Sequence, residues 1–80
     1  MTRQQNQFSL IVKQYVRRVN KLRFTRQDIL RDPEFMENVL SITESKTPGE
    51  QVSFLLQKLR DNGSLTFVDY DGTYEVVTSL

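Results

Sequence analysis

Neither cysteine nor histidine occurs in this sequence of 80 residues. Without cysteine the chain forms no disulfide and offers no thiolate to a metal ion. Without histidine it lacks the commonest general base, and it contains no Ser-His or Cys-His pair for nucleophilic catalysis. Two carboxylates near the C-terminus, Asp69 and Asp71, make a poor cation site by themselves. We therefore expect a chain that binds no cofactor and is not an enzyme on its own.

Long apolar segments are missing as well. No run approaches the roughly 18 apolar residues of a membrane-spanning helix. Residues 1–7 are polar and lack the apolar core of a signal peptide. We expect residues 1–7 to form a flexible N-terminus, residues 8–80 to form a single domain, and the protein to be cytoplasmic with no membrane partner.

The formal net charge of +1 conceals an uneven distribution of charge along the chain. Residues 1–31 contain eight of the eleven Lys and Arg residues and only one acid, Asp28, whereas residues 32–80 contain the other nine acids. A basic first third indicates a partner that carries negative charge. The alternative is an ordinary solvated helix face.

Apolar residues at helical spacing predict a first long helix over residues 8–22. They recur at steps of three and four and make one stripe, which consists of Phe8, Ile11, Val12, Tyr15, Val16, Val19 and Leu22. Arg23 and Phe24 interrupt this pattern, and a short strand could form at these two residues.

Two further helix starts follow. Thr25 is a suitable N-cap, and Asp28 at the third helical position lies near the positive end of the helix dipole. Pro33 limits this helix to a short one, and Asp32 before Pro33 starts the next. The apolar face of that next helix is predicted to be Phe35, Met36, Val39 and Leu40.

The last predicted helix begins after a linker over residues 45–50. Thr47 is expected to cap it, Pro48 suits its first position, and Glu50 completes a capping box. Asn62-Gly63 ends it, because both residues tolerate left-handed geometry. Its buried stripe is predicted to be Val52, Leu55, Leu56 and Leu59.

The C-terminal segment changes to a period of two, which predicts a β-hairpin. Leu65 and Phe67 alternate with polar neighbours, as do Tyr74 and Val76, and the turn lies at residues 70–72. Helices followed by a two-stranded C-terminal hairpin predict an α+β fold of the winged helix-turn-helix type. In that fold the third helix commonly enters the DNA major groove and the hairpin, or wing, touches the flanking backbone. Fold alone does not prove DNA binding.

Residues 24–74 also resemble a known family. The motifs are Phe24-Thr25-x-x-Asp28, Lys46-Thr47-Pro48, Leu56-Gln57-x-Leu59-Arg60-Asp61-x-Gly63 and Phe67-Val68-Asp69-x-x-Gly72-Thr73-Tyr74. They are similar to the winged-helix domain at the C-terminus of type II restriction endonucleases, including the family that cleaves Dam-methylated DNA. The resemblance implies sequence-specific recognition of double-stranded DNA, in some relatives at N6-methyladenine. It also implies a nuclease domain in a larger parent protein.

Candidate base contacts lie on the helix after residue 47, on the face opposite its apolar stripe. Phe54 points outward and suits a thymine methyl or the methyl of N6-methyladenine. The alternatives are cover by the N-terminus or by residues 41–46, and contact with another protein. The polar candidates are Gln51 and Gln57 for adenine, Glu50 for a cytosine amino group, and Ser53 for a base or a phosphate. Each of them is also compatible with a plain helix surface or a cap.

Candidate backbone contacts come from four regions of the chain. Lys46 and Thr47 lie at a helix N-terminus, where amide groups favour a phosphate. The others are Lys58, the pair Arg17 and Arg18, and Tyr70 and Thr73 on the wing. An acidic wing weakens attraction to phosphates, and the low net charge adds to this effect. The alternative function is therefore a winged helix that binds protein or dimerises without binding DNA.

Overall fold

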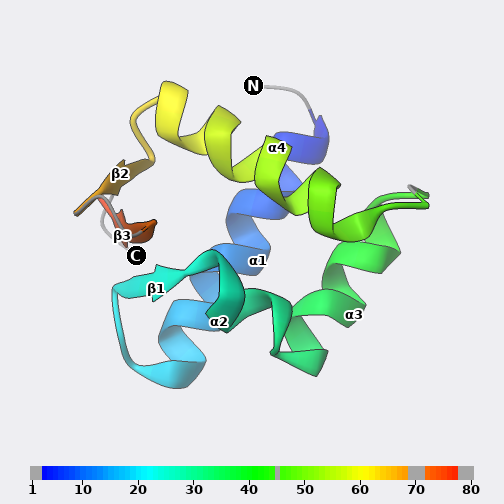
Figure 1. Ribbon diagram of the computed structural model, residues 1–80, viewed down its shortest axis with the longest axis horizontal. Coiled ribbons are helices and arrows are strands. Elements are labelled where there is room, and N and C mark those ends of the chain that lie inside the picture. The colour runs from blue at the N-terminus through cyan, green and yellow to red at the C-terminus, as the bar shows by residue number, and fades with distance from the viewer. Residues whose placement is uncertain (1–2, 45, 69–71, 78–80) are drawn as a thin grey trace.

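The computed structural model describes residues 3–44, 46–68 and 72–77. Within them the chain forms an α+β domain with a three-stranded antiparallel sheet. Figure 1 shows α4 lying in front of α1, with α2 and α3 below it and the strands at one side. In chain order the elements are α1 (Arg3–Val19), β1 (Arg23–Thr25), α2 (Arg26–Leu30), α3 (Pro33–Ile42), α4 (Pro48–Asp61), β2 (Leu65–Phe67) and β3 (Thr73–Val76).

Helix α1 begins and ends earlier than the apolar pattern predicts. Residues 3–7, which we expected in a flexible tail, form its first turns. The helix ends at Val19 because Asn20 adopts a φ of 57°, and Lys21 N–H bonds back to the Val16 carbonyl at 3.2 Å. The prediction that Leu22 belongs to the buried stripe is wrong. It lies beyond the helix and is 52% exposed.

Side-chain caps start α2 and α3. Thr25 Oγ1 accepts from Asp28 N–H, and the Asp28 carboxylate accepts from Thr25 N–H, both at 3.0 Å. Asp32 caps α3 by accepting from Phe35 N–H at 2.9 Å. Both predicted caps are confirmed, and the first is a complete capping box. Leu40 is a correction: it was predicted on the apolar face of α3, but it is 53% exposed.

Helix α4 buries the stripe that its sequence predicts. Val52, Leu55, Leu56 and Leu59 are each at most 1% exposed. Gly63 follows the helix with a φ of 88°, and Ser64 N–H bonds to the Leu59 carbonyl at 2.9 Å. The chain therefore reverses direction there and enters β2.

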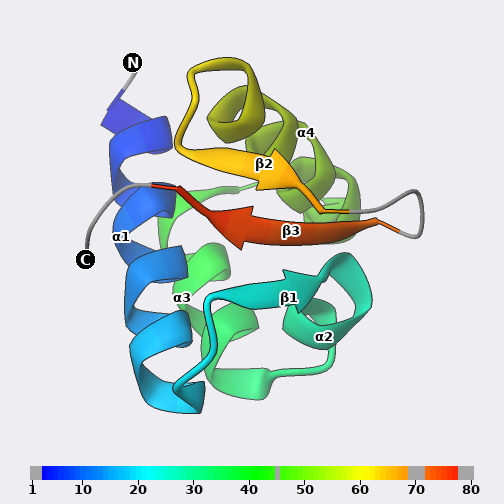
Figure 2. The ribbon, with the colours of Figure 1, turned by 90° about the vertical axis from the view of Figure 1, so that its left-hand side faces the viewer.

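The sheet has three strands, so the prediction of a two-stranded one is wrong. β3 lies between β1 and β2, as Figure 2 shows, and pairs antiparallel with both. Phe24 of β1 and Phe67 of β2 both pair with Tyr74 of β3. Phe24 is 2% exposed, so the strand that pairs with β3 also contributes its ring to the core.

One apolar core joins the helices to the sheet. The Tyr15 ring joins two other aromatic members of this core, with edge-to-face contacts to Phe24 at 6.0 Å and Phe35 at 5.6 Å between ring centroids. Phe35 in turn meets Phe8 at 5.9 Å. The buried members are Phe8, Ile11, Val12, Tyr15, Val16, Phe24, Ile29, Phe35, Val39, Val52, Leu55, Leu56, Leu59, Leu65 and Val76. This core fixes one side of α4 and leaves the other side at the surface.

In the described part of the chain, no helix has both the length and the apolar character needed to cross a membrane.

Candidate nucleic-acid interface

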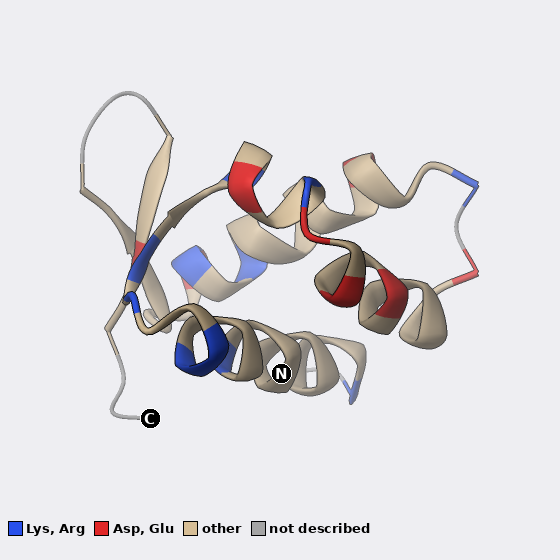
Figure 3. Cartoon of the chain, turned by 90° about the horizontal axis from the view of Figure 1, so that it is seen from below, with Lys and Arg blue, Asp and Glu red and all other residues tan. Residues whose placement is uncertain are grey.

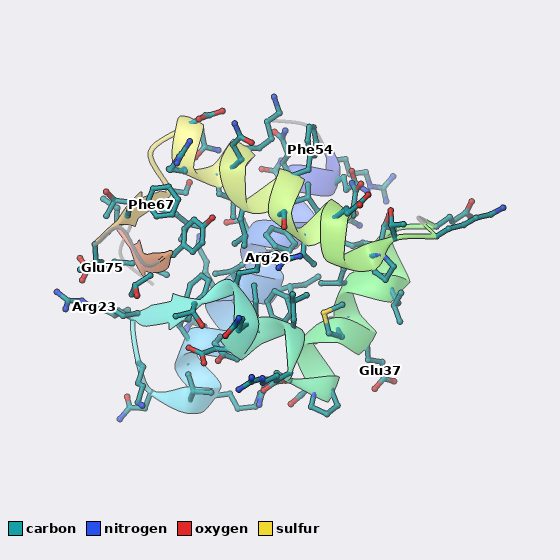
Figure 4. The ribbon with its side chains drawn as sticks, in the orientation of Figure 1. Arg23, Arg26, Glu37, Phe54, Phe67 and Glu75 are labelled. Atoms are coloured by element: carbon teal, nitrogen blue, oxygen red, sulfur yellow. The ribbon has the colours of Figure 1, made fainter. Side chains whose placement is uncertain are left out.

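Phe54 and Lys58 form a pair on the outer surface of α4. They are four residues apart, so they share one face of the helix. The Phe54 ring is 50% exposed, and Lys58 Nζ lies 5.1 Å from its centroid. Figure 4 shows Phe54 directed away from the body of the domain, on the side of α4 opposite Arg26. The prediction that Phe54 points outward is therefore confirmed. Gln57, also exposed, lies one turn along from Phe54.

Ser53 has an internal role that its sequence position does not indicate. Its hydroxyl accepts a hydrogen bond from Arg26 Nε and donates one to the Gly49 carbonyl at 3.2 Å. Arg26 Nη2 also donates to the Gly49 carbonyl, at 3.3 Å. Arg26 thus ties the first turn of α2 to the first turns of α4, and Figure 4 shows it between the two helices. Sequence reasoning counted Arg26 only as a charge, because no local pattern connects it to Ser53.

Gln51 points toward the N-terminus of α1. Its amide Nε2 donates to Gln4 Oε1 at 3.3 Å, and Gln4 Nε2 donates to the Ile42 carbonyl at 3.4 Å. These bonds connect α4, α1 and the end of α3. Gln51 is half-buried. It lies one turn before Phe54 on α4, on the side of the helix that meets α1.

The start of α4 differs from its predicted capping box. Thr47 is the N-cap residue, but its side chain makes no cap hydrogen bond. Its ψ is 71°, compared with 163° at Thr25, so the backbone does not direct the hydroxyl at the amide three residues on. The Thr47 carbonyl accepts from Glu50 and Gln51 N–H at 3.0 and 3.1 Å instead. Lys46, Thr47 and Glu50 are all exposed at this end of α4.

Arg17 and Arg18 lie elsewhere, in the last turn of α1. Arg18 bonds to Asp32 at 2.7 Å and to Glu34 at 2.8 Å, both at the start of α3. Its hydrogen bond holds the pKa of Asp32 below the ordinary value, and the same bond raises the pKa of Arg18. Figure 3 shows this underside of the domain, with blue segments on α1 and red segments on α3. The structure therefore separates Arg17 and Arg18 from the α4 surface.

An ion pair offsets one of the negative charges on the wing. Glu75 on β3 is paired with Arg23 on β1, at 2.7 Å between Nε and the carboxylate. Thr73 begins β3, where its carbonyl accepts from Val68 N–H at 2.9 Å. Tyr70, Asp69 and Asp71 lie outside the described residues.

The Phe67 ring connects the wing, which consists of β2 and β3, to α4. Phe67 stands against Tyr74 at 4.7 Å between centroids, and the Arg60 guanidinium lies 4.6 Å from the Phe67 centroid. Cation–π contacts of this kind contribute about 0.5–1 kcal/mol at exposed sites. The cluster holds β2 beside the last turn of α4.

The described residues contain no group of three or more His, Cys, Asp or Glu that could hold a metal ion. Comparison of the chain with protein families, with curated proteins and with solved structures finds no match.

Proposed function

We propose that the chain is a module that binds double-stranded DNA, with α4 in the major groove and the hairpin of β2 and β3 beside the flanking backbone. The order of elements supports this proposal: the short helix α2, then α3 and the longer helix α4 precede a hairpin, as in winged helix-turn-helix domains. The ring contact between Phe67 and Tyr74 and the guanidinium of Arg60 support a fixed placement of the wing beside α4.

The pair of the exposed Phe54 and the partly exposed Lys58 beside it carries the proposal. An outward phenylalanine on a helix suits the apolar methyl of thymine or of N6-methyladenine in the major groove. The ammonium group beside it suits the phosphates that line that groove. Gln57, one turn away and exposed, has the amide that pairs with adenine.

The resemblance to the C-terminal domain of restriction endonucleases belongs to the same proposal. Under it the chain is the target-recognition part of a larger protein, and a separate nuclease domain performs the cleavage. Adenine methylation at a short site is the feature that the Phe54 ring would read.

Fluorescence anisotropy tests this proposal directly. The chain is titrated with three labelled duplexes at two salt concentrations: methylated GATC, unmethylated GATC and a scrambled sequence. We expect one GATC duplex to bind about tenfold more tightly than the scrambled one, which corresponds to about 1.4 kcal/mol. Equal binding to all three, with a steep fall at higher salt, would reduce the chain to a phosphate binder. Absence of binding at low salt would overturn the proposal.

Protein binding is the second candidate, and the charge on α4 favours it. Glu50 and Asp61 are exposed on the same helix as Phe54, and carboxylates repel the DNA backbone. In that case the Phe54 surface would contact another protein or a second copy of the chain. Sedimentation equilibrium over a range of concentrations would then show self-association while the duplexes remain unbound.

A further inference from the structure

A groove lies on the underside of the domain, at the C-terminal end of α1. Its volume is about 330 Å³, and none of its lining residues belongs to α4. Figure 3 views this side, where blue segments appear just after α1 and on β1. The lining residues are Tyr15, Val19, Lys21, Arg23, Asp28 and Arg31.

Three cationic residues from separate parts of the chain line this groove. Lys21 comes from the turn after α1, Arg23 from β1, and Arg31 from the C-cap of α2. All three residues are exposed. Asp28 is the one carboxylate in the lining, and its oxygen accepts from Thr25 N–H at 3.0 Å. Arg23 is already ion-paired with Glu75, so Lys21 and Arg31 are the two cations left against the one lining carboxylate, which is itself bonded to the start of α2.

The scaffold under these cations is ordered by specific contacts. Arg23 is oriented by its 2.7 Å bond to Glu75, and its strand pairs with β3. Arg31 follows α2 directly, with its N–H bonded to the Gln27 carbonyl at 3.1 Å. The Tyr15 ring is packed between Phe24 and Phe35. The Arg23 guanidinium, which is held in this way, loses less conformational freedom when a ligand binds.

The phenol of Tyr15 stays protonated at neutral pH. Burial raises its pKa above the ordinary value, and the nearby carboxylates Asp28 and Asp32 add to the rise. A neutral phenol adds no negative charge to the groove and keeps an O–H donor.

We propose that this groove binds the phosphate group of a small phosphorylated molecule. Its volume lies at the lower end of the range for small-molecule sites, about 300–1,000 Å³. Lysine and arginine side chains are the usual partners of phosphate oxygens. The proposal does not rest on DNA binding by α4, because the two surfaces share no residue.

Amide chemical shifts in a ¹⁵N-labelled sample of the whole chain test the groove. The probes are inorganic phosphate and adenosine monophosphate, each at constant ionic strength, with adenosine as the control that lacks the phosphate. We expect saturable shifts at Lys21, Arg23 and Arg31 with both phosphate probes and none with adenosine. No saturable shift at these residues would overturn the proposal.

Two variants sharpen this test. Lys21→Gln and Arg31→Gln should each weaken adenosine monophosphate binding by about tenfold, and Lys13→Gln, on α1 outside the groove, should leave it unchanged. The spectrum of each variant reports whether the fold is retained. If one of the two groove variants fails to fold, the other still tests the proposal. Equal weakening by Lys13→Gln would indicate only diffuse attraction and contradict the proposal. A duplex without terminal phosphates that shifts these amides, while adenosine monophosphate does not, would also contradict it.

Discussion

Arg26 in the first turn of α2 donates a hydrogen bond to the hydroxyl of Ser53 on α4. Ser53 then donates to the Gly49 carbonyl, and a second nitrogen of Arg26 reaches the same carbonyl. Helices α2 and α4 are therefore joined by one guanidinium at the surface. The orientation of α4, and with it the direction of Phe54, depends partly on this contact.

Arg26 and Ser53 are expected to be energetically coupled. Arg26→Ala should lower the free energy of unfolding by about 0.5–1.5 kcal/mol, the usual contribution of a single hydrogen bond. Ser53→Ala should remove the same bond, so the double variant should be less destabilised than the sum of the two. Urea denaturation measures all three, and Gln27→Ala, also exposed on α2, is the control. Strict additivity would show that the contact contributes nothing to stability.

Thr25 and Thr47 occupy equivalent N-cap positions, but only Thr25 makes the cap hydrogen bond. Thr25→Ala should therefore lower the free energy of unfolding by about 0.5–2 kcal/mol. Thr47→Ala should cost clearly less, because no cap bond is lost. Thermal and urea denaturation of the two variants side by side make the comparison. A larger loss for Thr47→Ala would contradict the observed cap geometry.

Local patterns account for much of this fold. The stripe of α4, the caps at Thr25 and Asp32, and the stop at Gly63 depend on residues close in sequence, and all of them are confirmed. Periodicity fails where the core ends. Leu22 fits the apolar spacing, but it lies after Asn20, where the helix has already ended. Leu40 also fits the spacing, but it lies on a side of α3 where no other element packs closely enough to bury it.

The polar contacts between residues far apart in the chain could not be predicted from the sequence. Arg26 and Ser53 are 27 residues apart, and Arg23 and Glu75 are 52 residues apart. Side chains that meet across such separations leave no spacing signal, since their proximity depends on how the helices and strands pack. For the same reason the sequence did not predict the partners of Arg18. We predicted a contact with the DNA backbone there, whereas the Arg18 guanidinium binds Asp32 and Glu34 on another helix.

Acid should weaken the domain through Asp32. Its folded-state pKa is lowered mainly by the hydrogen bond from Arg18 and further by the Phe35 N–H. A lowered pKa means that the carboxylate stabilises the fold above its unfolded-state pKa of about 3.9. This contribution disappears as the pH falls from that value through the folded-state pKa. Urea denaturation over a pH series should show the decline.

Asp32→Asn is the matched variant for this pH dependence. Asparagine is also a good N-cap, so α3 keeps its start while the ion pair with Arg18 is lost. The variant should be less stable at neutral pH, and its stability should decline less steeply below pH ~4. Glu37→Gln, an exposed acid on the same helix, serves as the control for charge alone. An unchanged slope in Asp32→Asn would show that other carboxylates govern the acid response.

Phe54→Ala separates recognition from folding. Because the ring is half exposed and contacts Lys58, its loss should cost no more than about 1 kcal/mol of stability. If α4 reads bases, the variant should lose discrimination between methylated, unmethylated and scrambled duplexes more than it loses affinity for the scrambled one. Leu10→Ala is the control, since Leu10 is 59% exposed on α1 and lies outside the proposed interface. Equal losses on all three duplexes would mean that Phe54 supports the helix or the backbone contacts, and base reading would then have to be assigned to Gln57 or abandoned.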